Sequence, residues 1–207
     1  MIITWNGTES FKVQLGDNTL AFNPVSKDSK LKSVRFGADI ALVSLPHPDM
    51  NGVEQVTFGE KQPFVISGPG EYETKNIFIK GLTSHSLYGG KDGLNTIYTV
   101  ALDGMHLCFL GALDSEPKKE TLEDIDGIDI LFVPIGGVGV LDAAHAYKLA
   151  VQLEPKIIIP MHYSDGAALK TFLKEGGQNP SALEKLTVKR KDIEGKEGEI
   201  VVLTAQG

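Results

Sequence analysis

The chain contains one cysteine, Cys108, so it cannot form an intrachain disulfide bond. This cysteine lies in an apolar, strand-like stretch, where a buried free thiol is common. The N-terminus lacks a basic region followed by a long apolar stretch, and no apolar run approaches the roughly 18 residues that cross a bilayer. These absences predict a cytoplasmic protein that has no disulfide and does not enter a membrane.

Positive charge is also scarce. The chain has 20 Lys and Arg against 27 Asp and Glu, which gives a net charge of −7. Binding to nucleic acid without sequence preference requires a basic face that displaces counterions from phosphates. The only basic run, residues 189–191, is interpreted as a solvated turn. We therefore expect no nucleic-acid partner.

The composition is otherwise that of a packed protein, with 42% hydrophobic and 23% charged residues among 207. A chain of this length buries roughly 70% of its unfolded surface. Neither an internal repeat nor a low-complexity tract nor a break in composition marks a second unit. The sequence therefore predicts one domain over residues 1–207.

The hydrophobic periodicity changes along the chain. Up to residue 112 the pattern predicts short strands, at residues 2–5, 10–14, 19–22, 40–44, 64–66, 77–82, 96–102 and 106–110. Beyond it, strands at residues 128–134 and 156–160 alternate with helices at 121–125, 141–153 and 167–174, and Asp142 is predicted to cap the longest helix. The pattern fits the α+β class and favours a four-layer αββα sandwich, although periodicity alone also allows a generic α+β domain.

The most informative segment is the apolar stretch 39–44 and the turn after it, which reads Leu45, Pro46, His47, Pro48, Asp49 and Met50. With residues 3–7, 23–24, 69–73, 133–137 and 159–163, it resembles the metal-dependent hydrolase branch of the metallo-β-lactamase superfamily in order and spacing. That family places a His-x-His-x-Asp-His run directly after such a strand. The resemblance spans almost the whole chain and implies the αββα fold, but a fold does not fix a function.

The resemblance also implies which residues would hold two metal ions. In that family both histidines of the first pair and a histidine near residue 109 hold one ion. The Asp-His pair, a bridging aspartate near residue 112 and the histidine of the Pro-Met-His-Tyr segment hold the other. Of these ligands this chain keeps His47, Asp49 and His162. It departs from the family at Leu45, Met50, Phe109 and Ala112, and also at Thr8 and Asn23, where members often have His and Asp.

These replacements favour a protein that has lost the dinuclear hydrolase site. A zinc site needs three or four N, O or S donors, and the apolar side chains are of the type that fills a dry pocket. Our leading hypothesis is a binding, regulatory or partner-subunit role without a cofactor, in which the retained residues are relics and Asp49 bonds to His47 or His162. Its partner would be a small molecule or a protein, in a possible homo- or hetero-oligomer. The old cleft would be lined by His85, Leu45, Met50, Phe109 and Ala112, although His85 is equally well interpreted as a satisfied, partly exposed strand histidine.

The alternative hypothesis is a reduced hydrolase with one zinc, manganese or iron ion on Asp49 and His162. His47 or His85 would complete the ligand set, Asp49 would be the candidate catalytic residue, and the substrate would be an ester or phosphoester. A third possibility, metal-free hydrolysis with Ser44 or Ser86 as nucleophile, rests on proximity in the sequence alone. Among the remaining features, His106 and His145 are interpreted as surface or packing residues, and Gly136, Gly137 and Gly139 as a tight turn beside the cleft.

Overall fold

Two β-sheets packed face to face form the centre of the computed structural model, which describes residues 1–60, 62–164 and 166–206. The first sheet has the strand order β12-β1-β2-β3-β4-β5. Its strands are β1 (Ile2–Trp5), β2 (Phe11–Leu15), β3 (Asn18–Phe22), β4 (Ile40–Leu42), β5 (Phe64–Ile66) and β12 (Leu186–Thr187). The first four of the order are antiparallel neighbours, whereas β3, β4 and β5 run parallel.

The second sheet has the order β13-β11-β10-β9-β8-β7-β6. Its strands are β6 (Gly70–Thr74), β7 (Ile77–Ser86), β8 (Gly93–Leu102), β9 (Met105–Phe109), β10 (Ile130–Pro134), β11 (Ile157–Met161) and β13 (Glu199–Ile200). The strands from β6 to β9 pair antiparallel, and β9, β10, β11 and β13 pair parallel. Both sheets are therefore mixed.

The main core lies between the sheets and is rich in aromatic rings. Phe11 and Phe132 pack edge to face with centroids 4.8 Å apart, and Phe22 lies 5.0 Å from Phe109. All four side chains are fully buried. Alternation sends them there, because every second residue of a strand faces the same side of its sheet. In β9, Cys108 accordingly faces the helices while Phe109 faces the other sheet.

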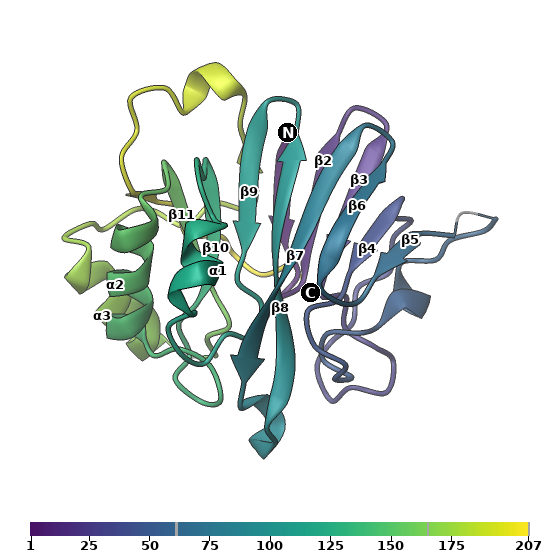
Figure 1. Ribbon diagram of the computed structural model, residues 1–207, viewed down its shortest axis with the longest axis horizontal. Coiled ribbons are helices and arrows are strands. Elements are labelled where there is room, and N and C mark those ends of the chain that lie inside the picture. Colours follow the sequence, from purple (N-terminus) through teal and green to yellow (C-terminus); the bar gives the residue numbers. More distant parts are fainter. Residues whose placement is uncertain (61, 165, 207) are drawn as a thin grey trace.

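Helices cover the outer face of the second sheet, on the left in Figure 1. They are α1 (Lys119–Glu123), α2 (Ala143–Leu153) and α3 (Gly166–Glu175). The predicted cap of α2 is confirmed: the Asp142 carboxylate accepts hydrogen bonds from the backbone N–H groups of Ala144 and His145, each at 3.0 Å. These bonds and the His145 ring hold the pKa of Asp142 below its ordinary value. The helix ends before Pro155, and Glu154 adopts a left-handed backbone.

The outer face of the first sheet is covered differently. Ala21, Ala38, Ala41 and Val56 form a small buried cluster under connecting loops and the 3-10 turn η1 (Val53–Gln55). Within the described residues this layer contains no α-helix, because the connecting sequence lacks helical apolar spacing. The predicted α+β sandwich is confirmed, with one of its outer layers built from loops.

The predicted elements agree with the structure to within a few residues, except for three strands that were not predicted, β6, β12 and β13. Strand β6 is an edge strand whose residues are mostly exposed, so it lacks the apolar alternation that signals a strand. Over the part of the chain that the structure describes, no helix has the length and apolar character to span a membrane.

The parallel strands of both sheets end on the same side of the sandwich, and this arrangement positions the polar residues. Pairing of β3 with β4 brings Asn23 beside the end of β4 and the turn that carries His47. Pairing of β10 with β11 brings Gly136 beside His162, whose carbonyl oxygen would lie 2.2 Å from a Cβ on that glycine. Only glycine leaves room for this approach.

Candidate functional site

The turn after β4 is tightly hydrogen-bonded. The N–H groups of Met50 and Asn51 both donate to the carbonyl of His47, at 2.8 and 3.0 Å. The N–H of Asp49 donates to Nδ1 of His47 at 3.2 Å, so this nitrogen acts as an acceptor. The bond fixes the His47 ring and leaves its hydrogen on Nε2.

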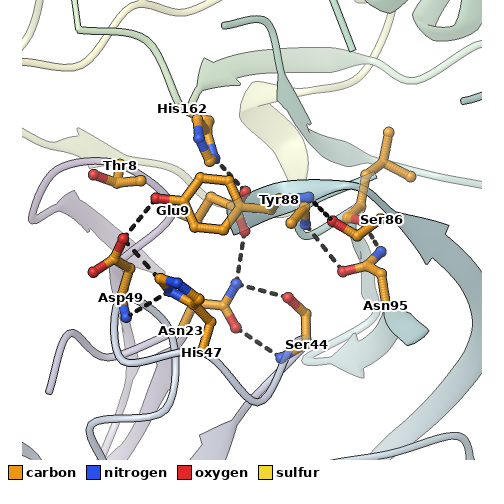
Figure 2. A network of polar contacts seen from close by, with 12 residues as sticks. Thr8, Glu9, Asn23, Ser44, His47, Asp49, Ser86, Tyr88, Asn95 and His162 are labelled. Atoms are coloured by element: carbon orange, nitrogen blue, oxygen red, sulfur yellow. Dashed lines mark hydrogen bonds and ion pairs between the residues drawn. The ribbon is translucent and has the colours of Figure 1, made fainter. Parts of the chain in front are cut away.

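Tyr88 fills the space between the two histidines. It begins the 3-10 turn η2 (Tyr88–Gly90) between β7 and β8. Its ring centroid lies 4.9 Å from that of His47 and 4.9 Å from that of His162, and both contacts are nearly perpendicular. Figure 2 shows the phenol reaching Asp49, and its hydroxyl donates to Oδ2 at 2.6 Å. Burial raises the pKa of Tyr88, and the bond to Asp49 raises it further, so the phenol stays protonated.

Asp49 accepts its hydrogen bonds from hydroxyl groups. Oδ1 accepts from the hydroxyl of Ser29, and Oδ2 accepts from Tyr88. Nδ1 of His47 lies 3.5 Å from Oδ2, which is farther from the carboxylate than either hydroxyl. Of the two partners expected for Asp49, the structure places His47 in contact with it, through the Asp49 N–H on Nδ1, whereas His162 turns to a different carboxylate.

That carboxylate is Glu9, which lies in the loop between β1 and β2 and is fully buried. Oε1 of Glu9 pairs with Nδ1 of His162, across 153 residues of sequence. Oε2 accepts from the side-chain amide of Asn23 at 2.7 Å, and that amide also donates to the hydroxyl of Ser44 at 2.8 Å. A carboxylate at Nδ1 keeps the hydrogen there, which leaves the lone pair on Nε2. No hydrogen bond to this Nε2 is seen from any described residue.

Three residues of this network have a left-handed backbone. The φ angles are 48° at Thr8, 41° at Asn23 and 55° at His162. Such a conformation is unfavourable for a β-branched residue such as Thr8. The N–H of His162 donates to the carbonyl of Thr8 at 2.8 Å, which ties two of the three together. Clustered strain of this kind is typical of ligand and catalytic sites.

The apolar replacements fall into two groups. Leu45, Met50 and Ala112 are buried together with Val140, and Tyr88 packs on them, so the structure brings together three of the residues expected at the old cleft. Phe109 lies instead in the main core between the sheets. The alternation of β9 points its side chain inward, away from the other three.

His85 lies apart from His47 and His162 and has two acidic partners of its own. Its Nδ1 is 2.8 Å from Asp114, its Nε2 contacts Asp92, and it lines a hollow of about 610 Å³ together with Leu94 and Pro117. His47 and His162 do not line this hollow, so of the two interpretations of His85 the structure agrees with a satisfied strand histidine rather than with a residue of their cleft. His106 and His145 are exposed, as expected. The Ser44 hydroxyl accepts from the amide of Asn23, and the Ser86 hydroxyl accepts from the N–H of Tyr88. Among the described residues, neither hydroxyl bonds to a histidine.

His85 should titrate above its ordinary value, because bonds to Asp92 and then to Asp114 raise its pKa from 6.5. A raised folded-state pKa stabilises the fold below the unfolded value, and this contribution disappears as the pH rises through the folded value. Asp114→Asn should therefore lower the midpoint of the His85 imidazole resonance in an NMR titration. It should lower the free energy of unfolding more at about pH 5.5 than at about pH 9. Asp103→Asn, in an exposed turn, is the control, and equal midpoints in both variants would contradict the assignment.

A family model described as the β-lactamase superfamily domain matches residues 2–162. The chain belongs to the metallo-β-lactamase superfamily.

Within the superfamily, several relatives are named metal-dependent hydrolases. One from Carboxydothermus hydrogenoformans is 49% identical, with 79% of this chain and 85% of the relative covered. Another from Thermoplasma acidophilum is 27% identical, with 78% and 83% covered. Among solved structures, a candidate zinc-dependent hydrolase from Thermotoga maritima matches with a TM-score of 0.78 at 27% identity and covers 98% of this chain and 97% of its own.

These names imply a divalent metal, so the donors of this chain can be tested against one. Within the described residues, no group of three or more His, Cys, Asp or Glu side chains is placed to hold an ion. The Tyr88 ring separates His47 from His162, and both oxygens of Asp49 accept from hydroxyls. Of the two retained histidines, His162 has a carboxylate at Nδ1, the arrangement that metal-ligating histidines usually show, and His47 does not. In this arrangement the retained side chains do not fit a superfamily metal centre.

Glu9, Ser29 and Tyr88 belong to the site but were not predicted from the sequence. Glu9 directly follows Thr8, a position where the superfamily resemblance had already indicated a departure, and an acid between two apolar strands is a signal that could have been used. Tyr88 sits in a turn next to Gly89 and Gly90, and nothing in its local sequence indicates that its ring folds back between two histidines.

Proposed function

We propose that the protein is a hydrolase that acts on an ester or phosphoester at the site around His162. The observation that supports this is the pairing of His162 with the buried carboxylate of Glu9. A carboxylate at Nδ1 fixes the tautomer and orientation of an imidazole, so that Nε2 can take a proton from an attacking water. The names of the relatives support the same broad class.

The proposed chemistry uses side chains only, because the retained donors do not fit an ion in this arrangement. His162 accepts a proton from the water as its oxygen attacks the carbonyl carbon or the phosphorus, and Glu9 stabilises the imidazolium that forms. The imidazolium then returns this proton to the leaving oxygen as the ester bond breaks, which restores the neutral His162. Asn23 holds the second oxygen of Glu9 and keeps the carboxylate in place. Tyr88 covers this region, so the turn at residues 87–90 must move before substrate reaches Nε2.

The test is turnover of p-nitrophenyl acetate and bis-p-nitrophenyl phosphate by the purified protein, with chelator and with added zinc, manganese or iron. His162→Ala should reduce turnover by about a hundredfold or more, and Glu9→Gln should reduce it less. His145→Ala, an exposed histidine on α2, is the matched control and should match the wild type. Turnover that is unchanged in His162→Ala contradicts the proposal. Turnover that appears only with one bound ion would replace the side-chain mechanism by a mononuclear metal-dependent one.

A second candidate function is non-catalytic ligand binding or regulation. It is favoured by the Tyr88 ring, which fills the space between the histidines, and by the apolar cluster beneath it. The same assays discriminate between the two candidates. A protein that turns over neither substrate under any metal condition, while retaining a specific ligand, would have this second function.

A further inference from the structure

The Tyr88 side chain lies in a slot whose walls have the character of a ligand site. The imidazoles of His47 and His162 flank the ring, and the apolar cluster of Leu45, Met50, Ala112 and Val140 packs against it. Asp49 accepts the hydroxyl at the far end. Ligand pockets are typically apolar with a few placed polar groups, and this slot has that composition.

Two glycines let the turn settle into this position. A Cβ on Gly139 would lie 2.8 Å from the Cα of Tyr88, so any larger residue would push the turn away. A Cβ on Gly89 would lie 3.3 Å from Nε2 of His47, and Gly89 has a φ of 74°. The turn at residues 87–90, at the tip of the hairpin between β7 and β8, therefore packs closely against its surroundings.

The turn is nevertheless held by few bonds. Among the described residues, two hydrogen bonds link residues 87–90 to positions outside the turn: Tyr88 hydroxyl to Asp49, and Tyr88 N–H to the Ser86 hydroxyl. Leu87, Gly89 and Gly90 are exposed. Apart from the Tyr88 ring, this segment buries little surface and makes few bonds, so it should open at a lower cost than the core.

We propose that this slot is a ligand site and that Tyr88 is its internal occupant. The ligand would be a small planar aromatic ring that carries a hydroxyl or another hydrogen-bond donor. It takes the place of Tyr88 between His47 and His162 and donates to Asp49 when the turn moves aside. This proposal rests on the proposed function, because it names the chemical class that the same site admits.

The shape and polarity of the slot select this class. Two imidazoles set perpendicular to a ring match the edge-to-face geometry that aromatic groups prefer. Oδ1 of Asp49 is already occupied by Ser29, so Oδ2 remains the acceptor for the occupant. A ring without a donor would leave this partly buried oxygen unpaired, which lowers affinity.

The experiment removes the Tyr88 ring by substitution and then adds phenol as a free ligand that can take its place. Tyr88→Ala deletes the phenol ring, so phenol is the matched probe and benzene is the probe without a donor. Binding is measured by calorimetry and by chemical shift changes of the full chain. Tyr88→Ala should bind one phenol about tenfold or more tighter than benzene, and about tenfold tighter than the wild type binds phenol. Tyr147→Ala, a half-buried tyrosine on α2 that packs on Phe172, is the control cavity and should not show this preference.

Two further variants keep the proposal falsifiable. Asp49→Ala in the Tyr88→Ala background removes the acceptor and should abolish the preference for phenol over benzene. Tyr88→Phe, which keeps the ring but loses the bond to Asp49, should bind phenol more tightly than the wild type because its turn opens more easily. Equal affinity for phenol and benzene in folded Tyr88→Ala overturns the proposal, as does unchanged phenol binding by Tyr88→Phe if the alanine variant fails to fold. Phenol binding without any turnover would overturn the proposed hydrolase and leave the slot in place.

Discussion

His162→Ala should lower the free energy of unfolding by about 3 kcal/mol, because it leaves the buried carboxylate of Glu9 without the Nδ1–H group that donates to Oε1. Glu9 is fully buried, and the amide of Asn23 would be its remaining described partner. Loss of one member of a buried pair costs more than loss of its packing, since the other member keeps its desolvation penalty. Urea unfolding at neutral pH, followed by circular dichroism, measures the difference.

A second substitution separates this effect from loss of packing. Glu9→Gln in the His162→Ala background removes the stranded charge, so the double variant should be more stable than His162→Ala by about 1 kcal/mol or more. His145→Ala serves as the control, because its pair with Asp142 is exposed and contributes at most about 1 kcal/mol. If His162→Ala and His145→Ala lose the same stability, Glu9 does not carry a buried charge that His162 offsets.

The apolar pattern of the sequence predicted most of the strands because alternation is a local property, whereas the sandwich was implied by the superfamily resemblance. Val13 and Lys12, neighbours in β2, face opposite sides, and that contrast is visible in the sequence. Strand β7 was predicted to end at residue 82 but continues to Ser86, since residues 83–86 pair with residues 93–96 of β8. That extension depends on the partner strand, and the polar residues of β7 alone do not indicate it.

The candidate site could be predicted in part. The superfamily resemblance pointed to His47, Asp49 and His162, and the structure brings them near one another because they follow the ends of parallel strands. The bond between Glu9 and His162 joins positions 153 residues apart, so neither local periodicity nor spacing could indicate it. The position of the Tyr88 ring depends on how a hairpin tip folds over the sheet ends, which is a tertiary property.

Phe109→Ala should lower the free energy of unfolding by about 3–5 kcal/mol, which is the usual cost of a large cavity in a rigid core. Phe109 is fully buried, and its ring centroid lies 5.0 Å from that of Phe22 and 5.9 Å from that of Phe132. These neighbours belong to both sheets, so the cavity cannot be closed by a shift of one strand. Phe64→Ala, at an exposed position on β5, is the matched control and should cost less than about 1 kcal/mol.

Phe109→His restores the residue that the superfamily resemblance implies and tests the same assignment from the chemical side. In the main core the imidazole would lie among aromatic rings without a hydrogen-bond partner, which costs about 1–3 kcal/mol beyond the lost packing. The variant should therefore be destabilised, and zinc should not restore its stability. A ligand facing an open metal cleft would behave in the opposite way, because metal that binds only the folded protein raises its stability. Rescue of Phe109→His by zinc would place residue 109 at the cleft and contradict the inward orientation of β9.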